Sequence, residues 1–209
     1  DKNAYERNKE AVHNENKYVF NCMNTDKICI FTDTGKMHTI KAVDIPLGRF
    51  RDKGTPVDNL SNYDSSKERM LYVAPVGQLR SDRLLFVTKT SMCKLVEGAE
   101  FDVAKRTIAS TKLADEDELI FIGSASEMEQ IVLQSHGGCF LRFLTQEVST
   151  MKKTALGVRG MKLADDDYLE HAYLLAGHQE YTISYHDKEY ALNKVRLAKR
   201  DTKGIKPRI

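Results

Sequence analysis

Clustered lysines and arginines are the side chains of this sequence best suited to a chemical task. The clusters include Lys105-Arg106, Lys152-Lys153 and Lys199-Arg200. Such pairs can bind the phosphate groups of nucleic acids, because Lys and Arg combine positive charge with several hydrogen-bond donors. Their number decides nothing, since 32 basic and 30 acidic residues leave a formal net charge of only +2. Any nucleic-acid role must therefore come from how the charges are arranged.

Residues for catalysis or metal binding form no recognised pattern. The six histidines show no HExxH or other zinc-site spacing, and the sequence has no glycine-rich phosphate loop or serine nucleophile elbow. Cys22, Cys29, Cys93 and Cys139 form no CxxC pair, which fits free thiols that act as small buried hydrophobes in a reducing compartment. The stretch 136–139 (HGGC) holds one pair of possible ligands, so we interpret it as a hairpin turn. We expect no catalytic residue, metal or cofactor in this chain.

Composition favours a folded protein outside the membrane. A hydrophobic share of 41% is enough for a packed core. No stretch approaches the ~18 consecutive apolar residues that cross a bilayer, and residues 1–5 (DKNAY) contain no apolar signal core. We therefore expect a cytoplasmic protein with no membrane partner.

A repeat with a period near 50 residues organises the chain. Residues 112–117 (KLADED) recur as 162–167 (KLADDD), 50 positions later, and this period suits a four-stranded blade. The residues on either side of these segments show three clearly similar copies of the repeat and a fourth that is less similar. We expect a single domain over 1–209, with residues 1–17 as the remnant of a preceding blade. The repeats are expected at roughly 18–75, 76–122, 123–172 and 173–209.

The repeating unit is predicted to be β-structure. Its apolar runs, such as 28–31 (ICIF) and 84–87 (LLFV), are too short for helices and are bounded by turn residues. Gly35 and Gly138 readily adopt the positive φ that tight hairpins need. Ser91 in the equivalent position should make its turn less stable, because a side chain disfavours positive φ. One such sheet cannot bury its own face, so the copies must pack side by side. The sequence predicts a propeller-like ring or spiral.

Each repeat separates its charges. The segment that follows the hairpin turn is basic. The loop that follows the leucine of the recurring KLAD segment is acidic, as in 115–118 (DEDE) and 165–167 (DDD). Stacking would therefore make one rim positive and another negative. A positive rim would bind duplex DNA through its phosphates without reading bases. The expected DNA-binding residues are Lys36, Lys41, Arg49, Arg51, Lys53, Lys89, Lys94, Lys105, Arg106, Arg142, Lys152, Lys153, Arg159, Lys194, Lys199, Arg200, Lys203 and Lys206.

Other interpretations of these charges stay open at this stage. Taken singly, each lysine fits the ordinary solvated surface of a protein with 30% charged residues. A protein-interaction β-propeller would use the same repeats and would suit the balanced charge. The location of the repeated cations separates the two functions, because DNA requires an outer rim and a peptide requires a central funnel.

Several motifs resemble one protein family. Residues 154–163 (TALGVRGMKL) closely resemble the G-V-R-G-[IM]-K-L signature of the C-terminal domains of bacterial type IIA topoisomerase A subunits, from DNA gyrase and topoisomerase IV. The stretch 31–60 is similar to the second blade of that family and 86–101 to the third, and the match covers most of 18–209 in the family's order. The resemblance implies an all-β fold, a β-pinwheel of four to five four-stranded blades, with duplex DNA bent around its basic edge.

The resemblance also implies a division of labour. The domain would be non-catalytic and would present DNA to the strand-passage core of an ATP-dependent type II DNA topoisomerase in the bacterial cytoplasm, at the nucleoid. Strand cleavage would use a tyrosine of the A-subunit core, and ATP and Mg would bind through other domains or subunits. The expected partners are double-stranded DNA, the A-subunit core and the B subunit.

One departure from the family pattern concerns DNA wrapping. Gyrase A subunits carry a Q-R-R-G-G-K-G box, but residues 4–12 (AYERNKEAV) contain no glycine, and their nearest imitation is 199–204 (KRDTKG). Glycine loss prevents close backbone approach to phosphate, and Glu6 and Glu10 add repulsion. We therefore expect a topoisomerase IV-like or weakly wrapping gyrase-like domain.

Overall fold

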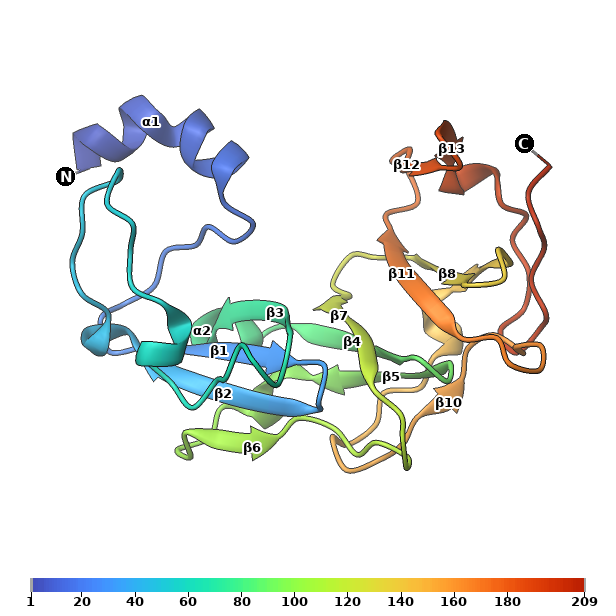
Figure 1. The fold of residues 1–209 in the computed structure, drawn as a ribbon, viewed down its shortest axis with the longest axis horizontal. Coiled ribbons are helices and arrows are strands. Elements are labelled where there is room, and N and C mark those ends of the chain that lie inside the picture. Colours follow the sequence, from blue (N-terminus) through green and yellow to red (C-terminus); the bar gives the residue numbers. More distant parts are fainter. Residues whose placement is uncertain (1, 209) are drawn as a thin grey trace.

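The computed structural model describes residues 2–208, which form an arc of β-sheets preceded by helix α1 (Lys2–Glu15) (Figure 1). The first sheet has the strand order β3-β1-β2-β6 and the second β10-β5-β4-β7; the third is β11-β8-β9 and the fourth is the hairpin β12-β13. Their bounds are β1 Lys27–Thr32, β2 Lys36–Lys41, β3 Met70–Pro75, β4 Arg83–Thr88, β5 Met92–Glu97, β6 Thr107–Ala109, β7 Leu119–Ser124, β8 Gln130–Ser135, β9 Phe140–Leu144, β10 Val158–Arg159, β11 Leu169–Leu175, β12 Thr182–Tyr185 and β13 Lys188–Ala191.

Helical turns punctuate the strands. The short helix α2 spans Val76–Leu79. The 3-10 turns are η1 Ala42–Asp44, η2 Val57–Asn59, η3 Gly98–Phe101, η4 Thr145–Glu147 and η5 Leu192–Lys194. Four of them, η1, η3, η4 and η5, follow the second strand of a hairpin, and after η3, η4 and η5 the chain pairs with the preceding sheet.

The all-β prediction is confirmed, with two differences in detail. Only the first two sheets have four strands; the third has three and the fourth has two. The sequence predicts the remnant of a blade for residues 1–17, yet most of this segment, Lys2–Glu15, forms the helix α1. Alanine, glutamate and lysine, with no glycine or proline, make this stretch a good helix former, and local propensity prevails because no sheet covers it.

Adjacent sheets exchange strands. β6 follows β5 in sequence but pairs with β2 of the first sheet, with Met37 opposite Ile108. β10 follows β9 but pairs with β5, with Cys93 opposite Val158. Ile205 of the fourth repeat likewise bridges to Phe140 at the edge of the third sheet. We call these exchanged segments the limbs of the second (103–109), third (149–159) and fourth (196–205) repeats. Each limb closes the free edge of the preceding hairpin.

The hairpin turns have the predicted conformation. Gly35, Ser91 and Gly138 occupy the same position with φ of 76°, 74° and 80°. The positive φ of Ser91 is strained for a residue with a side chain, but two hydrogen bonds offset this strain. The Ser91 Oγ accepts the backbone N–H of Met161 at 2.7 Å, and the Ser91 carbonyl oxygen accepts that of Gly160. Side-chain oxygens can satisfy buried backbone donors in this way. Ser91, which is predicted from the sequence to destabilise its turn, therefore fixes the end of the limb of the third repeat.

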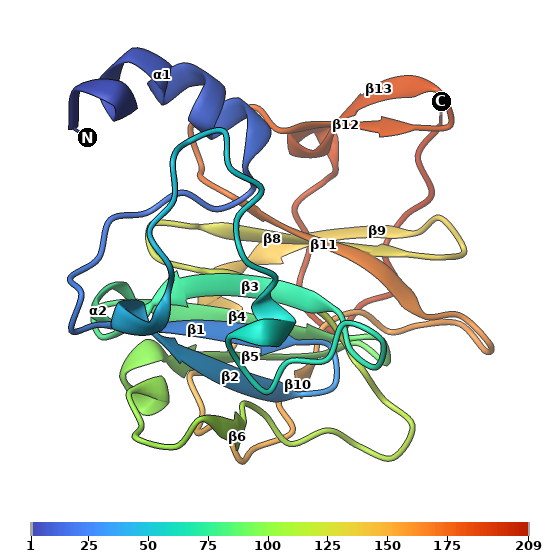
Figure 2. The same cartoon turned by 60° about the vertical axis from the view of Figure 1, so that its left-hand side comes forward.

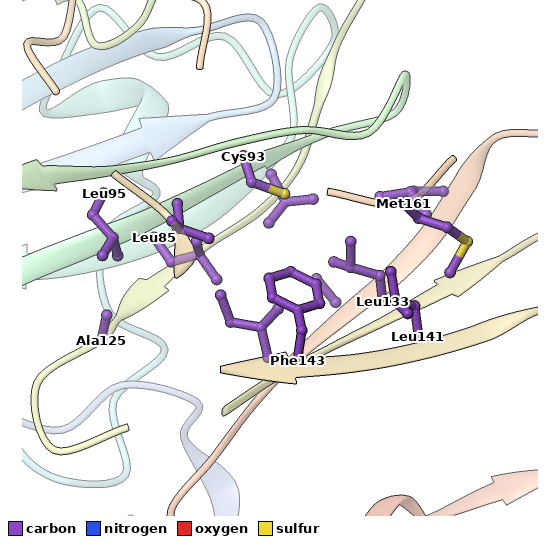
Figure 3. Close-up of a cluster of buried hydrophobic side chains, with 13 residues drawn as sticks. Leu85, Cys93, Leu95, Ala125, Leu133, Leu141, Phe143 and Met161 are labelled. Atoms are coloured by element: carbon purple, nitrogen blue, oxygen red, sulfur yellow. The ribbon is translucent and has the colours of Figure 1, made fainter. Parts of the chain in front are cut away.

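Apolar side chains fill the space between consecutive sheets. Leu85 and Leu95 of the second sheet meet Leu133 and Phe143 of the third, with Met161, just after the limb of the third repeat, beside them (Figure 3). Full burial of each such side chain contributes about 1.5 to 3 kcal/mol. The two largest clusters are thus shared between neighbouring sheets, whereas Ile28, Ile30 and Ile40 of the first sheet form a smaller cluster with residues of that sheet's own β2–β3 connection.

Glycines let the limbs approach their acceptor strands. A Cβ at Gly157 would lie 2.6 Å from the Cys93 carbonyl oxygen, and a Cβ at Gly204 would lie 2.7 Å from that of Phe140. Gly54 occupies the same place in the first repeat with φ of 70°, but nothing lies within 4 Å of its Cβ position. Ile45, the counterpart of the buried Val148 and Val195, is 40% exposed. Among the described residues, the limb of the first repeat has no acceptor.

These glycines provide a matched test of the exchange. Gly157→Ala and Gly54→Ala both place a Cβ at positive φ, which costs about 1 to 3 kcal/mol. Only Gly157→Ala adds a clash with an acceptor carbonyl, so its free energy of unfolding in urea should fall by clearly more than that of Gly54→Ala. Equal losses in the two variants would contradict the role assigned to the Gly157 contact.

Candidate nucleic-acid interface

Most of the predicted DNA-binding residues are exposed. The exposed members are Lys36, Lys41, Arg49, Arg51, Lys53, Lys105, Arg106, Lys152, Arg159, Lys194, Lys199, Lys203 and Lys206. Lys89, Arg142, Lys153 and Arg200 are half-buried, and Lys94 is buried. The limbs of the third and fourth repeats carry Lys152 and Lys199 at equivalent places, which puts one exposed cation on each of two neighbouring sheets.

Lys94 is wrongly included among the DNA-binding residues. It is 1% exposed and its Nζ donates to the carbonyl oxygens of Lys153 at 2.8 Å and Ala155 at 2.6 Å, with that of Lys152 at 3.4 Å. The ammonium also lies 5.7 Å from the centre of the Phe86 ring. Burial lowers the pKa of Lys94 to about 8, against an opposing effect of Glu100. This lysine holds the limb of the third repeat and cannot reach a phosphate.

Arg142 needs a similar correction. Its Nε donates to Gln130 Oε1 at 2.8 Å, and its guanidinium also bonds the carbonyl oxygens of Asn193 and Val195. Leu197 pairs with Arg142 through a parallel bridge. The side chain therefore fastens the fourth repeat to the third sheet, a role that alternation of residue types along a strand does not reveal.

The basic segments of the repeats are less alike than their sequences suggest. The limb of the second repeat runs directly along β2, where the Thr39 N–H donates to the Arg106 carbonyl oxygen at 2.9 Å and Thr107 follows at once in β6. The third repeat inserts a detour, 152–157, between its first contact with β5, at Ser149 to Met151, and β10. Lys105-Arg106 therefore does not occupy the position of Lys152-Lys153. In the first repeat, Arg49, Arg51 and Lys53 lie in the loop that extends toward α1 (Figure 2).

Lysines converge on a groove between the limbs of the second and third repeats. It has a volume of about 570 Å³ and is lined by Lys105, Lys112 and Lys153, together with hydroxyl-bearing residues including Thr107 and Thr154. Ammonium and hydroxyl groups are suitable donors to phosphate oxygens. Lys112 is absent from the set predicted from the sequence, although it begins the recurring KLAD segment. Its counterpart Lys162 lines a smaller groove with Lys203.

The acidic loops have structural tasks. Asp117 accepts the N–H and hydroxyl of Thr90, and Asp167 accepts the N–H of Gly137 at 2.9 Å, so each carboxylate caps a hairpin turn of its own sheet. Although burial opposes ionisation, bonds from Ser135 and from the N–H groups of Gly137 and Tyr168 hold the pKa of Asp167 below its usual value. The expectation of a free negative rim must be narrowed, since these two carboxylates are engaged.

Several cations of the predicted set are paired with carboxylates. Arg159 forms a two-point ion pair with Asp201, and Lys89 lies 3.2 Å from Glu118. Arg49 lies 3.5 Å from Asp52. Exposed pairs of this kind contribute roughly 0 to 1 kcal/mol and exchange partners readily. They lower the local positive potential without blocking a phosphate.

The HGGC stretch forms the β8–β9 turn, as expected. The Gly138 N–H donates to the Ser135 carbonyl oxygen at 3.0 Å, and His136 stacks on Tyr168 with ring centroids 4.7 Å apart. Cys29 and Cys93 are buried, as predicted for small hydrophobes, but Cys22 is exposed. Across residues 2–208, no group of three or more His, Cys, Asp or Glu side chains is placed to hold a metal ion. None of the described helices is long and apolar enough to cross a membrane.

Comparison with protein families gives a direct assignment. The family model for the DNA gyrase C-terminal domain, β-propeller, matches residues 26–65, 82–126 and 129–176, which is more than half of the chain. The chain belongs to this family. The three matched segments contain the hairpins β1–β2, β4–β5 and β8–β9, and the second and third segments also contain the exchanged strands β6 and β10. Membership does not favour the alternative of a protein-interaction propeller.

Relatives of both enzyme types are similar to this family member. The A subunit of DNA gyrase from Ureaplasma parvum is 27% identical over 184 residues, covering 85% of this chain and 22% of the relative. The A subunit of DNA topoisomerase 4 from Bacillus subtilis is 29% identical over 155 residues, covering 73% and 19%. The chain thus spans about a fifth of the length of these relatives.

Solved structures support the fold. The C-terminal domain of DNA topoisomerase IV aligns with a TM-score of 0.79 and 22% identity, covering 97% of this chain and 66% of that one. A DNA gyrase A C-terminal domain aligns with a TM-score of 0.65 and 21% identity, covering 88% and 60%. The β-pinwheel inferred from sequence motifs is therefore confirmed as the fold.

Lys94 should give this gyrase-family domain a specific pH dependence. Burial lowers its pKa from the ordinary value of 10.5 to about 8 in the folded protein. Between these values the unfolded chain binds more protons, so the free energy of unfolding should rise with pH by up to about 3 kcal/mol. Lys94→Met should lack this rise in urea titrations between about pH 7.5 and 10.5, and Lys41→Met, an exposed control, should keep it. Equal pH profiles in the two variants would contradict the buried ammonium.

Proposed function

We propose that this chain is a non-catalytic domain that binds and bends duplex DNA for a type IIA topoisomerase A subunit. The carrying observation is that exchanged limbs present exposed lysines at related places on neighbouring sheets, Lys152 and Lys199, while the exposed Lys105 and Lys112 line one groove. Such a row of cations neutralises successive phosphates without reading bases. Family membership supports the same function.

The proposed role is to hold DNA for a reaction that takes place elsewhere. In the parent protein, the domain would present duplex DNA to the strand-passage core in the bacterial cytoplasm. That core would act with a B subunit, and ATP and Mg would bind outside this chain. No residue of this chain is assigned a catalytic task. Selectivity among DNA sequences would follow from how easily each sequence bends.

We propose bending more than chiral wrapping. The segment 199–204, which most resembles the gyrase box, does not present a free loop: Asp201 pairs with Arg159, and Gly204 packs against the Phe140 carbonyl. Gyrase-like wrapping would need a glycine-rich loop that phosphate can approach closely. The described structure places no such loop at the start of the first sheet, where α1 lies. A topoisomerase IV-like or weakly wrapping domain fits these features.

Salt dependence tests DNA binding. The logarithm of the binding constant should fall linearly with the logarithm of salt concentration, with a slope of about −0.9 per phosphate contact. Lys152→Glu combined with Lys199→Glu should weaken binding to all duplexes alike and reduce the slope by about 2. Lys67→Glu, in an exposed turn where Lys67 pairs with Asp64, is the charge-matched control for each of the two single reversals. Wild-type protein that fails to bind duplex DNA at low salt would contradict the proposal.

Ligation of nicked circular plasmid distinguishes bending from wrapping. With saturating domain present during ligation, we expect little change in the linking number of the closed product, because bending within a plane adds no writhe. Short fragments should nevertheless cyclise faster, because the domain reduces the elastic cost of bending. A large, single-signed linking-number change would favour chiral wrapping.

A further inference from the structure

Glu100 is joined to the limb of the third repeat at three points. Its Oε2 accepts the backbone N–H of Lys153 at 3.1 Å, and its Oε1 lies 3.2 Å from the Lys152 ammonium. In return, Lys153 Nζ donates to the Glu100 carbonyl oxygen at 3.2 Å. The carboxylate belongs to η3, at the end of the hairpin that accepts the limb. Its side chain is only 17% exposed.

Glu147 repeats two of these three contacts on the next sheet. Its Oε2 accepts the backbone N–H of Arg200 at 3.0 Å, and Arg200 Nε donates to the Glu147 carbonyl oxygen at 3.1 Å. Both glutamates are 53 positions before their partners and lie in equivalent 3-10 turns. We call each reciprocal pair, Glu100 with Lys153 and Glu147 with Arg200, a clasp.

The clasps act on the backbone of the segments that carry exposed cations. Lys152 directly precedes Lys153, and Lys199 directly precedes Arg200. A carboxylate that accepts a backbone N–H forms a charge-assisted bond, about twice as strong as a neutral one. Partial burial opposes ionisation of Glu100, but its bonds to Lys153 and Lys152 outweigh this and lower its pKa, so the carboxylate stays charged at neutral pH.

We propose that Glu100 and Glu147 are positioning residues for DNA binding, which fix the limbs of the third and fourth repeats so that Lys152 and Lys199 meet successive phosphates. This inference rests on the proposed DNA-binding function. It also assigns different tasks to adjacent cations: Lys153 and Arg200 complete the clasps, while Lys152 and Lys199 bind DNA.

For the change in DNA affinity on removal of these carboxylates, the proposal predicts the opposite sign to charge repulsion alone. Removing a negative charge from a DNA-binding surface should strengthen binding, because it removes repulsion of the phosphates. Removing a clasp should instead weaken binding, because the limb loses its fixed position and ordering it again costs conformational entropy. A carboxylate that merely happens to be near DNA follows the first rule, and a positioning carboxylate follows the second.

The test compares Glu100→Ala/Glu147→Ala with Glu97→Ala. Glu97 ends β5 near Glu100 but is exposed. We expect the double variant to bind a bent-DNA probe about three- to tenfold more weakly at fixed salt, as for loss of one to two phosphate contacts, while Glu97→Ala binds equally or more tightly. Glu100→Gln/Glu147→Gln should recover most of the affinity, because an amide oxygen still accepts the N–H.

Amide hydrogen exchange tests the clasps in the absence of DNA. The backbone amides of Lys153 and Arg200 should exchange at least about tenfold faster in the double alanine variant, since a bond to a charged group is lost, while amides of β4 and β8 stay protected. Unchanged exchange at both amides, or tighter DNA binding by the folded double alanine variant, would overturn the inference. Wild-type protein that bound no DNA would contradict the proposed function, and the exchange result would still test the clasps.

Discussion

Pairing between a limb of one repeat and the free edge of the preceding hairpin is the interaction on which the rest of this structure depends. A two-stranded hairpin is only marginally stable alone, and its open edges invite unwanted pairing. The limbs of the second, third and fourth repeats close the edges of β2, β5 and β9. The same exchange brings apolar faces together, so that Leu95 and Phe143 share one core. Neighbouring sheets consequently stabilise one another.

The exchange also explains why charged groups are buried in an otherwise apolar interface. A limb that leaves the ladder and returns exposes backbone groups that no strand can satisfy. Lys94 bonds the carbonyl oxygens of the detour, and Glu100 and Glu147 bond its N–H groups and those of the next limb. Burial of a charge is costly unless several hydrogen bonds offset it. Lys94, Glu100 and Glu147 meet backbone groups that the exchange leaves open, and the neighbouring exposed lysines, Lys152 and Lys199, gain fixed positions.

Much of the fold could be predicted from the sequence, because turns and repeats are recorded locally. Gly35, Ser91 and Gly138 occupy one turn position in three apolar hairpins, and the recurring KLAD segment marks the period. The site was harder to predict. Lys94 and Lys152 are both lysines in basic segments, yet one is buried under a limb and the other is exposed on it. In the sequence, Lys105 and Lys152 lie at similar places in their repeats. In the structure they do not, because the limb that carries Lys105 runs directly along β2 without the detour of the third repeat. These differences depend on contacts between residues about 50 positions apart.

By itself, the sequence determined a β-repeat architecture, the place of each hairpin turn and the family signature at 154–163. Short-range steric preferences and the alternation of apolar residues act within a few positions, so they can be recognised along the chain. Only the tertiary structure decided which sheet receives each limb, which cations remain exposed and which carboxylates are engaged. Those outcomes follow from where the exchanged backbone leaves polar groups without partners, and that location exists only once two repeats are packed together.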